Sequence, residues 1–87
     1  MVEMSQIEAL SKQIVEQFQP ERIILFGSYT YGEPTLDSDV DLLVMMPFEG
    51  HSPQKAAEIR FQVRPRFPLD LLVRTPELLR QRLEQSR

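Results

Sequence analysis

Apolar residues recur along this chain at spacings that predict both helices and strands. Near the start, apolar positions three or four residues apart form one face of a helix: Ile7, Leu10, Ile14 and Phe18. The segment Ser5–Glu8 has the form of a capping box, in which a hydroxyl and a carboxylate satisfy the free amides of a helix start. Pro20 stops the pattern. We therefore expect an amphipathic helix that begins near Ser5.

Three short runs are typical of strands. They are Arg22–Phe26, which is apolar and β-branched, then residues 39–46, and then Leu69–Arg74. In the second run, period-two alternation places Asp39, Asp41 and Leu43 on one face and the intervening apolar residues on the other. The polar segment from Ser28 to Ser38 separates the first two runs, and its composition predicts a turn or short helix followed by a loop.

Two more helices are expected in the second half. Ser52–Pro53 is typical of a helix start, with proline at the first helical position. The segment after it is ambiguous: Ala56, Ile59 and Val63 fit a helix, whereas Ile59, Phe61 and Val63 alternate as in a strand, and we favour the helix. Thr75–Pro76 opens a last helix, whose apolar positions are Leu78, Leu79 and Leu83.

The predicted order of elements is helix, strand, turn, strand, helix, strand, helix. This order indicates an α+β fold, close to α/β, with a small mixed sheet packed against helices. Eighty-seven residues are enough for one small domain, so residues 1–87 are expected to form a single unit.

Composition removes several classes of function. The chain has no cysteine, which excludes disulfides and thiolate metal sites. A formal net charge of −3 argues against nucleic-acid binding through bulk electrostatics. No apolar run approaches membrane-spanning length, and the first residues lack the features of a signal peptide, so the expectation is a cytoplasmic protein.

Candidate chemistry lies between Gly27 and Val44. A strand that ends in Gly27–Ser28 lets the backbone approach a phosphate closely, and the serine hydroxyl adds a donor. Asp39 and Asp41 are at positions i and i+2 of the predicted second strand, so both carboxylates share one face, about 6.5–7 Å apart at the backbone. Hard oxygen ligands in such a pair suit Mg²⁺, which would also offset their mutual repulsion.

Asp70 supplies a third acid. It lies in a run of otherwise apolar residues and proline, where a charge is costly unless it is paired or coordinated. If the third strand lies beside the second, Asp70 can join Asp39 and Asp41 at a magnesium site, with two ions about 3.5–4 Å apart. In that arrangement Asp70 would also accept the proton of an acceptor hydroxyl.

The pattern Gly27–Ser28, ten residues, Asp39-x-Asp41 and a later acid in an apolar strand resembles the DNA polymerase β-like nucleotidyltransferase superfamily. The length and the run from Ser38 to Val44 look like the minimal nucleotidyltransferases (MNT), the antitoxins of HEPN–MNT toxin–antitoxin pairs. The resemblance covers almost the whole chain.

The resemblance implies a role for each matched position. Gly27 and Ser28 match the triphosphate-binding pair, and Asp39, Asp41 and Asp70 match the catalytic, metal-binding carboxylates. Such proteins transfer AMP from ATP with Mg²⁺, and some modify a tyrosine of a HEPN ribonuclease toxin, which silences it. The expected partners are therefore a nucleotide triphosphate and a HEPN-type toxin, with oligomeric state, nucleobase and target residue left open.

One departure concerns the outer phosphates. Where many relatives carry basic residues after the Gly-Ser pair, this chain has Tyr29 and Tyr31, which either stack on a base or pack in the fold. The basic side chains that would contact the outer phosphates are then expected elsewhere, and the candidates are Arg60, Arg64 and Arg74.

Each candidate residue also has an ordinary structural explanation. Gly27–Ser28 is a common strand-ending turn, and paired aspartates also occur as solvated charges at strand edges. Asp70 could form an ion pair with Arg74 or Arg22. The only histidine, His51, lies in a predicted loop without neighbouring ligands and is expected to be solvated.

Two alternatives to an adenylyltransferase antitoxin remain at this stage. A binding module would neutralise its partner by contact alone, through apolar surface on the last helix. A nucleotidyltransferase that acts on a small molecule or RNA would need a partner subunit to complete its substrate pocket.

Overall fold

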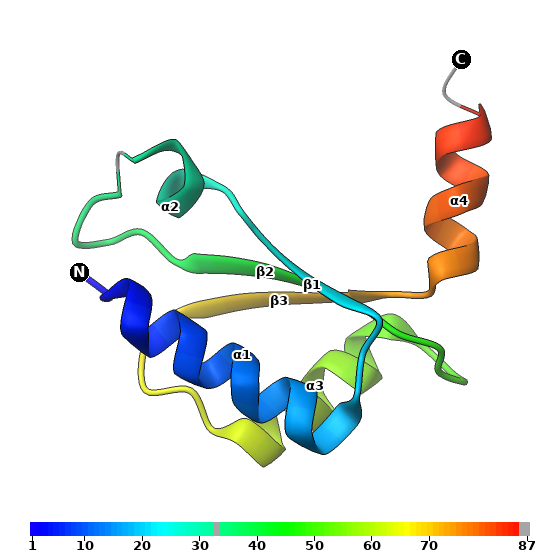
Figure 1. Ribbon diagram of the computed structural model, residues 1–87, viewed down its shortest axis with the longest axis horizontal. Helices are drawn as coiled ribbons and strands as arrows, with labels where there is room; N and C mark the ends of the chain where they lie inside the picture. The colour runs from blue at the N-terminus through cyan, green and yellow to red at the C-terminus, as the bar shows by residue number, and fades with distance from the viewer. Residues whose placement is uncertain (33, 86–87) are drawn as a thin grey trace.

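The computed structural model describes residues 1–32 and 34–85, and for Leu79 and residues 82–85 it describes the backbone alone. Its elements confirm the predicted α+β order (Figure 1). They are α1 (Met4–Phe18), β1 (Arg22–Phe26), α2 (Ser28–Tyr31), β2 (Val40–Met45), α3 (Ser52–Val63), β3 (Leu69–Arg74) and α4 (Pro76–Gln85). No helix in the described part of the chain is long and apolar enough to cross a membrane.

The three strands form one mixed sheet in the order β1-β2-β3. β1 pairs with β2 in the antiparallel direction, and β2 pairs with β3 in the parallel direction. Parallel neighbours need a crossover connection, and α3 provides it. Figure 1 shows α1 and α3 together on one face of the sheet, so the opposite face carries no long helix.

Alternation along the strands sorts side chains between these two faces. Val40, Leu42 and Val44 of β2 are buried toward the helices, as are Leu69, Leu71 and Val73 of β3. They pack against buried apolar residues of the helices: Ile7, Leu10, Ile14, Ile59 and Val63. The intervening residues of β2 and β3, including both strand aspartates, therefore face the side that α1 and α3 do not cover.

The start of α1 differs from the prediction. The helix begins at Met4 rather than near Ser5, and Glu3 is its N-cap. The side chain of Gln6 accepts a hydrogen bond from the Glu3 amide at 2.8 Å, which is the reciprocal contact of a capping box. The predicted box at Ser5–Glu8 is therefore wrong by two residues, because Gln6 in the third helical position serves in place of Glu8.

Exposure resolves the ambiguous segment in favour of a helix. Ile59 and Val63 are buried, whereas 68% of Phe61 is exposed. A strand would have placed these three residues on the same face, while a helix separates Phe61 from the other two. The helix α3 is thus confirmed.

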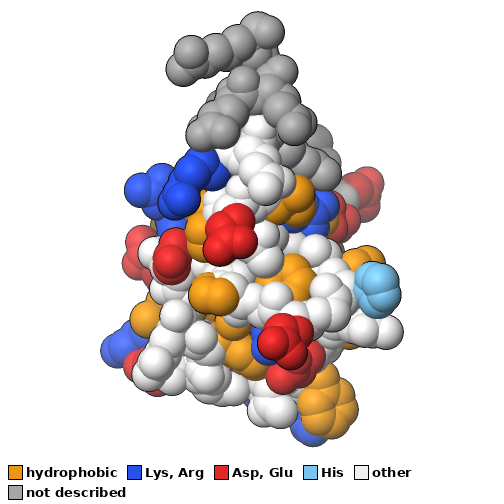
Figure 2. Space-filling view, turned by 90° about the vertical axis from the view of Figure 1, so that its right-hand side faces the viewer, with side chains coloured by type: hydrophobic (Ala, Val, Ile, Leu, Met, Phe, Trp, Pro, Cys, Tyr) orange, Lys and Arg blue, Asp and Glu red, His pale blue; other side chains and the backbone are white. Residues whose placement is uncertain are grey.

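The last helix, α4, begins as predicted and extends away from the sheet (Figure 1). The hydroxyl of Thr75 accepts a hydrogen bond from the Leu78 amide at 3.1 Å, which caps the helix start. Leu78 is half-buried, and the side chains of Leu79 and Leu83, expected to provide an apolar contact surface, lie outside the described side chains. On this side of the molecule, acidic and basic side chains are interspersed with small apolar areas (Figure 2).

Candidate active site

A glycine turn ends β1 and starts α2. Gly27 has φ 78° and ψ −157°, a conformation that essentially only glycine adopts. Thr30 holds the turn closed, because its amide and its hydroxyl both donate to the Gly27 carbonyl, at 3.0 and 2.6 Å. Ser28, the other residue of the predicted pair, is the first residue of α2 and is half-buried.

The space beside Gly27 is filled by the carboxylate of Asp41. A Cβ atom built on Gly27 would lie 2.0 Å from Asp41 Oδ2. The strand register explains the contact, since Phe26, the residue before Gly27, pairs with Asp41. The sequence analysis explained Gly27 by the close approach of a phosphate. The structure shows that the lack of a side chain at Gly27 also makes room for the Asp41 carboxylate.

Asp41 and Asp70 lie side by side on the neighbouring strands β2 and β3. They are register partners in the parallel pair β2–β3, so both point to the face that α1 and α3 leave uncovered. Burial raises the pKa of the Asp41 carboxyl, and the charges of Asp70 and Asp39 and a hydrogen bond with Asp70 raise it further. Asp41 therefore holds a proton more readily than an isolated aspartate does.

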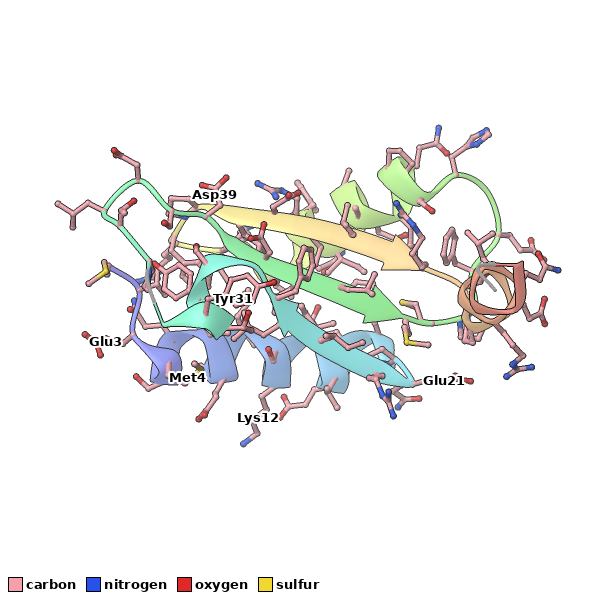
Figure 3. All side chains as sticks on the ribbon, turned by 90° about the horizontal axis from the view of Figure 1, so that it is seen from above. Glu3, Met4, Lys12, Glu21, Tyr31 and Asp39 are labelled. Carbon is pink, nitrogen blue, oxygen red and sulfur yellow. The ribbon has the colours of Figure 1, made fainter. Side chains whose placement is uncertain are left out.

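Asp39 lies outside this pair. The strand begins at Val40 rather than at Asp39, which is exposed on the loop that leads into β2. Figure 3 shows Asp39 at the end of the sheet where β2 and β3 begin. Its charge acts on Asp41, but among the side chains that the structure describes no three acidic, histidine or cysteine groups converge closely enough to hold a metal ion. The structure thus brings Asp41 and Asp70 together and leaves Asp39 beside them.

Asp70 forms no ion pair with Arg74 or Arg22, or with any other residue whose side chain is described, so the ion-pair explanation of this residue is wrong. The one ion pair found among these side chains joins Lys55 and Glu58 on α3. Arg74 instead donates to the carbonyl of Val73 at 2.8 Å. Asp70 is exposed and its carboxylate is available to a ligand.

The three arginines considered for the outer phosphates make other contacts. Arg60 donates to the carbonyl of Leu69, and Arg74 to that of Val73. Arg64 lies over the ring of Phe61, with 5.5 Å between the guanidinium carbon and the ring centroid. The structure therefore does not place any of the three on the carboxylate pair.

The two tyrosines after the glycine turn have different environments. Tyr29 packs against the core, and its hydroxyl accepts a hydrogen bond from the Val2 amide at 3.1 Å, so it is a packing residue. Tyr31 is 80% exposed, and Figure 3 shows it on α2. Of the two, only Tyr31 is free to contact a ligand.

Two side chains have structural roles at the site that the sequence did not indicate: Thr30 was not singled out, and Arg60 was considered only as a phosphate ligand. Thr30 closes the glycine turn, and its position three residues after Gly27 was an available signal, because hydroxyl side chains often bond to the backbone at that spacing. Arg60 bonds to the start of β3, which no local pattern indicates, since the two partners are nine residues apart and belong to different elements. The histidine prediction is confirmed: His51 is exposed at the N-cap of α3.

Comparison with known proteins agrees with this geometry. The family model described as nucleotidyltransferase domain matches residues 7–87, which is nearly the whole chain. No curated protein and no solved structure matches it. A mixed three-stranded sheet with helices on one face is consistent with a polymerase β-like core. The chain belongs to the nucleotidyltransferase domain family, whose members transfer nucleotidyl groups.

Proposed function

We propose that this nucleotidyltransferase transfers AMP from ATP to a tyrosine hydroxyl of a HEPN ribonuclease toxin and acts as the antitoxin. The observation that carries the proposal is the facing pair Asp41 and Asp70, beside the Gly27 turn on the uncovered face of the sheet. The resemblance of the whole chain to minimal nucleotidyltransferases supports the choice of donor and acceptor.

The carboxylates fit a magnesium ion. All three candidate ligands are hard oxygen donors, and burial and like charges raise the pKa of Asp41, so a cation would bind there at an electrostatic advantage. Asp41 and Asp70 would hold it, and Asp39, on the loop before β2, is the third candidate ligand. When bound, Mg²⁺ would neutralise charge on the phosphates of the nucleotide.

Gly27 and Ser28 are proposed to bind the triphosphate. The turn presents backbone amides and a serine hydroxyl next to the carboxylate pair, and these groups suit phosphate oxygens. Because Asp41 already occupies the space over Gly27, the phosphates would lie on the outer side of the turn. Ser28 would then orient the chain of phosphates relative to Asp41.

Asp70 is proposed to act as the base. The acceptor hydroxyl oxygen forms a bond to the α-phosphorus, and the bond from that phosphorus to the oxygen that bridges to the β-phosphate breaks. Pyrophosphate leaves with the bonding electrons, and the acceptor proton passes to Asp70. The exposure of Asp70 lets an incoming hydroxyl reach it.

The position of the pair favours a macromolecular acceptor. Asp41 and Asp70 lie on the sheet face that α1 and α3 do not cover. A groove of about 590 Å³ lies instead between α1 and β1, lined by residues such as Val15, Ile23 and Leu25. An acceptor carried on another protein can reach this face directly, whereas small-molecule sites are usually enclosed clefts.

The decisive experiment is intact mass spectrometry of the HEPN-type protein encoded beside this chain, after incubation with the chain, ATP and Mg²⁺. The wild type is expected to add one or more AMP units, and Asp41→Asn and Asp70→Asn none. Asp37→Asn changes an exposed acid in the preceding loop and is the matched control, expected to behave as wild type.

Other outcomes separate the alternatives. An unmodified toxin that still binds the chain and loses its ribonuclease activity would exclude AMP transfer and favour neutralisation by contact. Pyrophosphate release that depends on an added small molecule or RNA, with no change in toxin mass, would favour a transferase subunit with another acceptor.

A further inference from the structure

Arginine side chains reach the outer edge of β3 at two places. β3 is an edge strand, so the backbone groups on its far side have no neighbouring strand. Arg60 of α3 donates to the Leu69 carbonyl at the start of the strand. Arg74 donates to the Val73 carbonyl at its end, at 2.8 Å.

The start of β3 is therefore held from both sides. On the inner side, the Val40 amide of β2 donates to the Pro68 carbonyl at 2.9 Å. On the outer side, Arg60 holds the carbonyl of Leu69, which belongs to the peptide bond that leads into Asp70. The two contacts together fix the backbone immediately before the Asp70 side chain.

This end of the strand has a physical reason to separate. Asp41 and Asp70 are register partners, and like charges directly opposite each other on neighbouring strands are destabilising. Strand ends at the edge of a sheet open more readily than central strands. A cationic donor on the outer carbonyl opposes both effects, since a hydrogen bond to a charged group is stronger than a neutral one.

We propose that Arg60 is a positioning residue, which holds the start of β3 so that Asp70 stays opposite Asp41 and which contacts neither nucleotide nor acceptor. The catalytic consequence rests on the proposed transfer reaction, but the placement of Asp70 does not. Arg74 offers a control, because it also donates to an outer carbonyl of β3, but that carbonyl belongs to its own neighbour Val73 at the other end of the strand.

Amide hydrogen exchange tests the placement without any activity. In the parallel ladder that pairs Val40 with Leu69, the Asp70 amide faces β2, so its exchange reports separation of the strands. Arg60→Met is expected to speed exchange at Asp70 by about tenfold, and Arg74→Met to leave it within about twofold of wild type. Equal exchange rates at Asp70 in wild type and Arg60→Met would overturn the proposal, whatever the protein's activity.

Steady-state kinetics then separates positioning from simple structural support. With the toxin as acceptor, Arg60→Met is expected to lower kcat by about 10- to 100-fold, with KM for ATP within about twofold. Arg60→Lys keeps one charged donor and is expected to restore part of kcat. A kcat loss no larger than that of Arg74→Met, despite faster exchange at Asp70, would also overturn the proposal. Absence of transfer by the wild type would instead refute the proposed function and leave the exchange result to decide how Asp70 is placed.

Discussion

Gly27→Ala should destabilise the fold through two separate effects at one position. An alanine at φ 78° and ψ −157° is strained by about 1–3 kcal/mol. Its Cβ would also lie 2.0 Å from Asp41 Oδ2, so Asp41 must leave its rotamer, at a cost of about 0.5–1.5 kcal/mol. Together these effects amount to about 1.5–4.5 kcal/mol, which corresponds to a loss of about 6–36 °C in Tm for a domain of this size.

Urea unfolding followed by far-UV circular dichroism measures this loss. Gly32→Ala is the control, because Gly32 has φ 77° but a Cβ there would meet no atom within 4 Å. Gly32→Ala should therefore lower the free energy of unfolding only by the cost of a left-handed backbone, about 1–2 kcal/mol. Repeating Gly27→Ala in an Asp41→Ala background removes the collision and should reduce its cost by about 0.5–1.5 kcal/mol.

The reasoning fails if Gly27→Ala costs no more than Gly32→Ala and the cost is the same with and without the Asp41 carboxylate. That result would mean that Asp41 does not occupy the space over Gly27, and the close approach of turn and carboxylate would have to be abandoned.

Other substitutions test the remaining contacts. Tyr29→Phe should lower the free energy of unfolding by about 0.5–1.5 kcal/mol, because the Val2 amide loses its acceptor, and chemical denaturation measures it. Ile14→Ala, at a fully buried position, should cost about 2–5 kcal/mol, whereas Val15→Ala, at a half-exposed neighbour, should change stability by less than about 1 kcal/mol. Mg²⁺ should raise the Tm of the wild type in thermal unfolding and leave the Tm of the Asp41→Asn/Asp70→Asn variant unchanged. A rise in the Tm of both proteins would mean that the ion binds elsewhere.

The sequence predicted the elements well where side-chain periodicity matches burial. The apolar spacing of α1 and the alternation of β2 and β3 were sufficient, because one face of each element packs in the core. The start of α1 was predicted near Ser5 and lies at Met4, because Gln6 rather than Glu8 takes the reciprocal position of the capping box. The directions of strand pairing were not available from local patterns, because they depend on how α3 packs across the sheet.

The candidate site shows the same division between local and tertiary information. The spacing of Asp39 and Asp41 and the apolar surroundings of Asp70 identified the three acids, but Asp39 lies before the strand, and the pairing of Asp41 with Asp70 follows from the parallel register of β2 and β3. The contact between Gly27 and Asp41, however, requires the antiparallel register of β1 and β2. The contact of Arg60 with the edge of β3 depends on helix placement, so the sequence could offer this arginine only as a phosphate ligand.

Asp41→Asn should make the protein more stable at neutral pH, because the negative charge proposed to serve the reaction is unfavourable within the fold. Burial and the nearby charges of Asp70 and Asp39 raise the pKa of Asp41 above its ordinary value of 3.8. The folded protein thus binds this proton more tightly than the unfolded chain does. The stability that the group contributes is fully present below pH 3.8 and is lost as the pH rises through the raised pKa.

The asparagine variant has no such titration, so its advantage over wild type should grow with pH and reach about 1 kcal/mol near pH 7, the repulsion of two unit charges at about 4 Å in water. Urea unfolding at several pH values between about 3 and 7 measures the difference, and Asp37→Asn, an exposed acid outside the pair, should show no such growth. Saturating Mg²⁺ should then stabilise the wild type and narrow the gap at neutral pH, because a cation removes the repulsion that the amide avoids. An asparagine variant that is less stable than wild type at neutral pH would show that the Asp41 charge is already compensated within the fold, and the main argument for a cation at this pair would be lost.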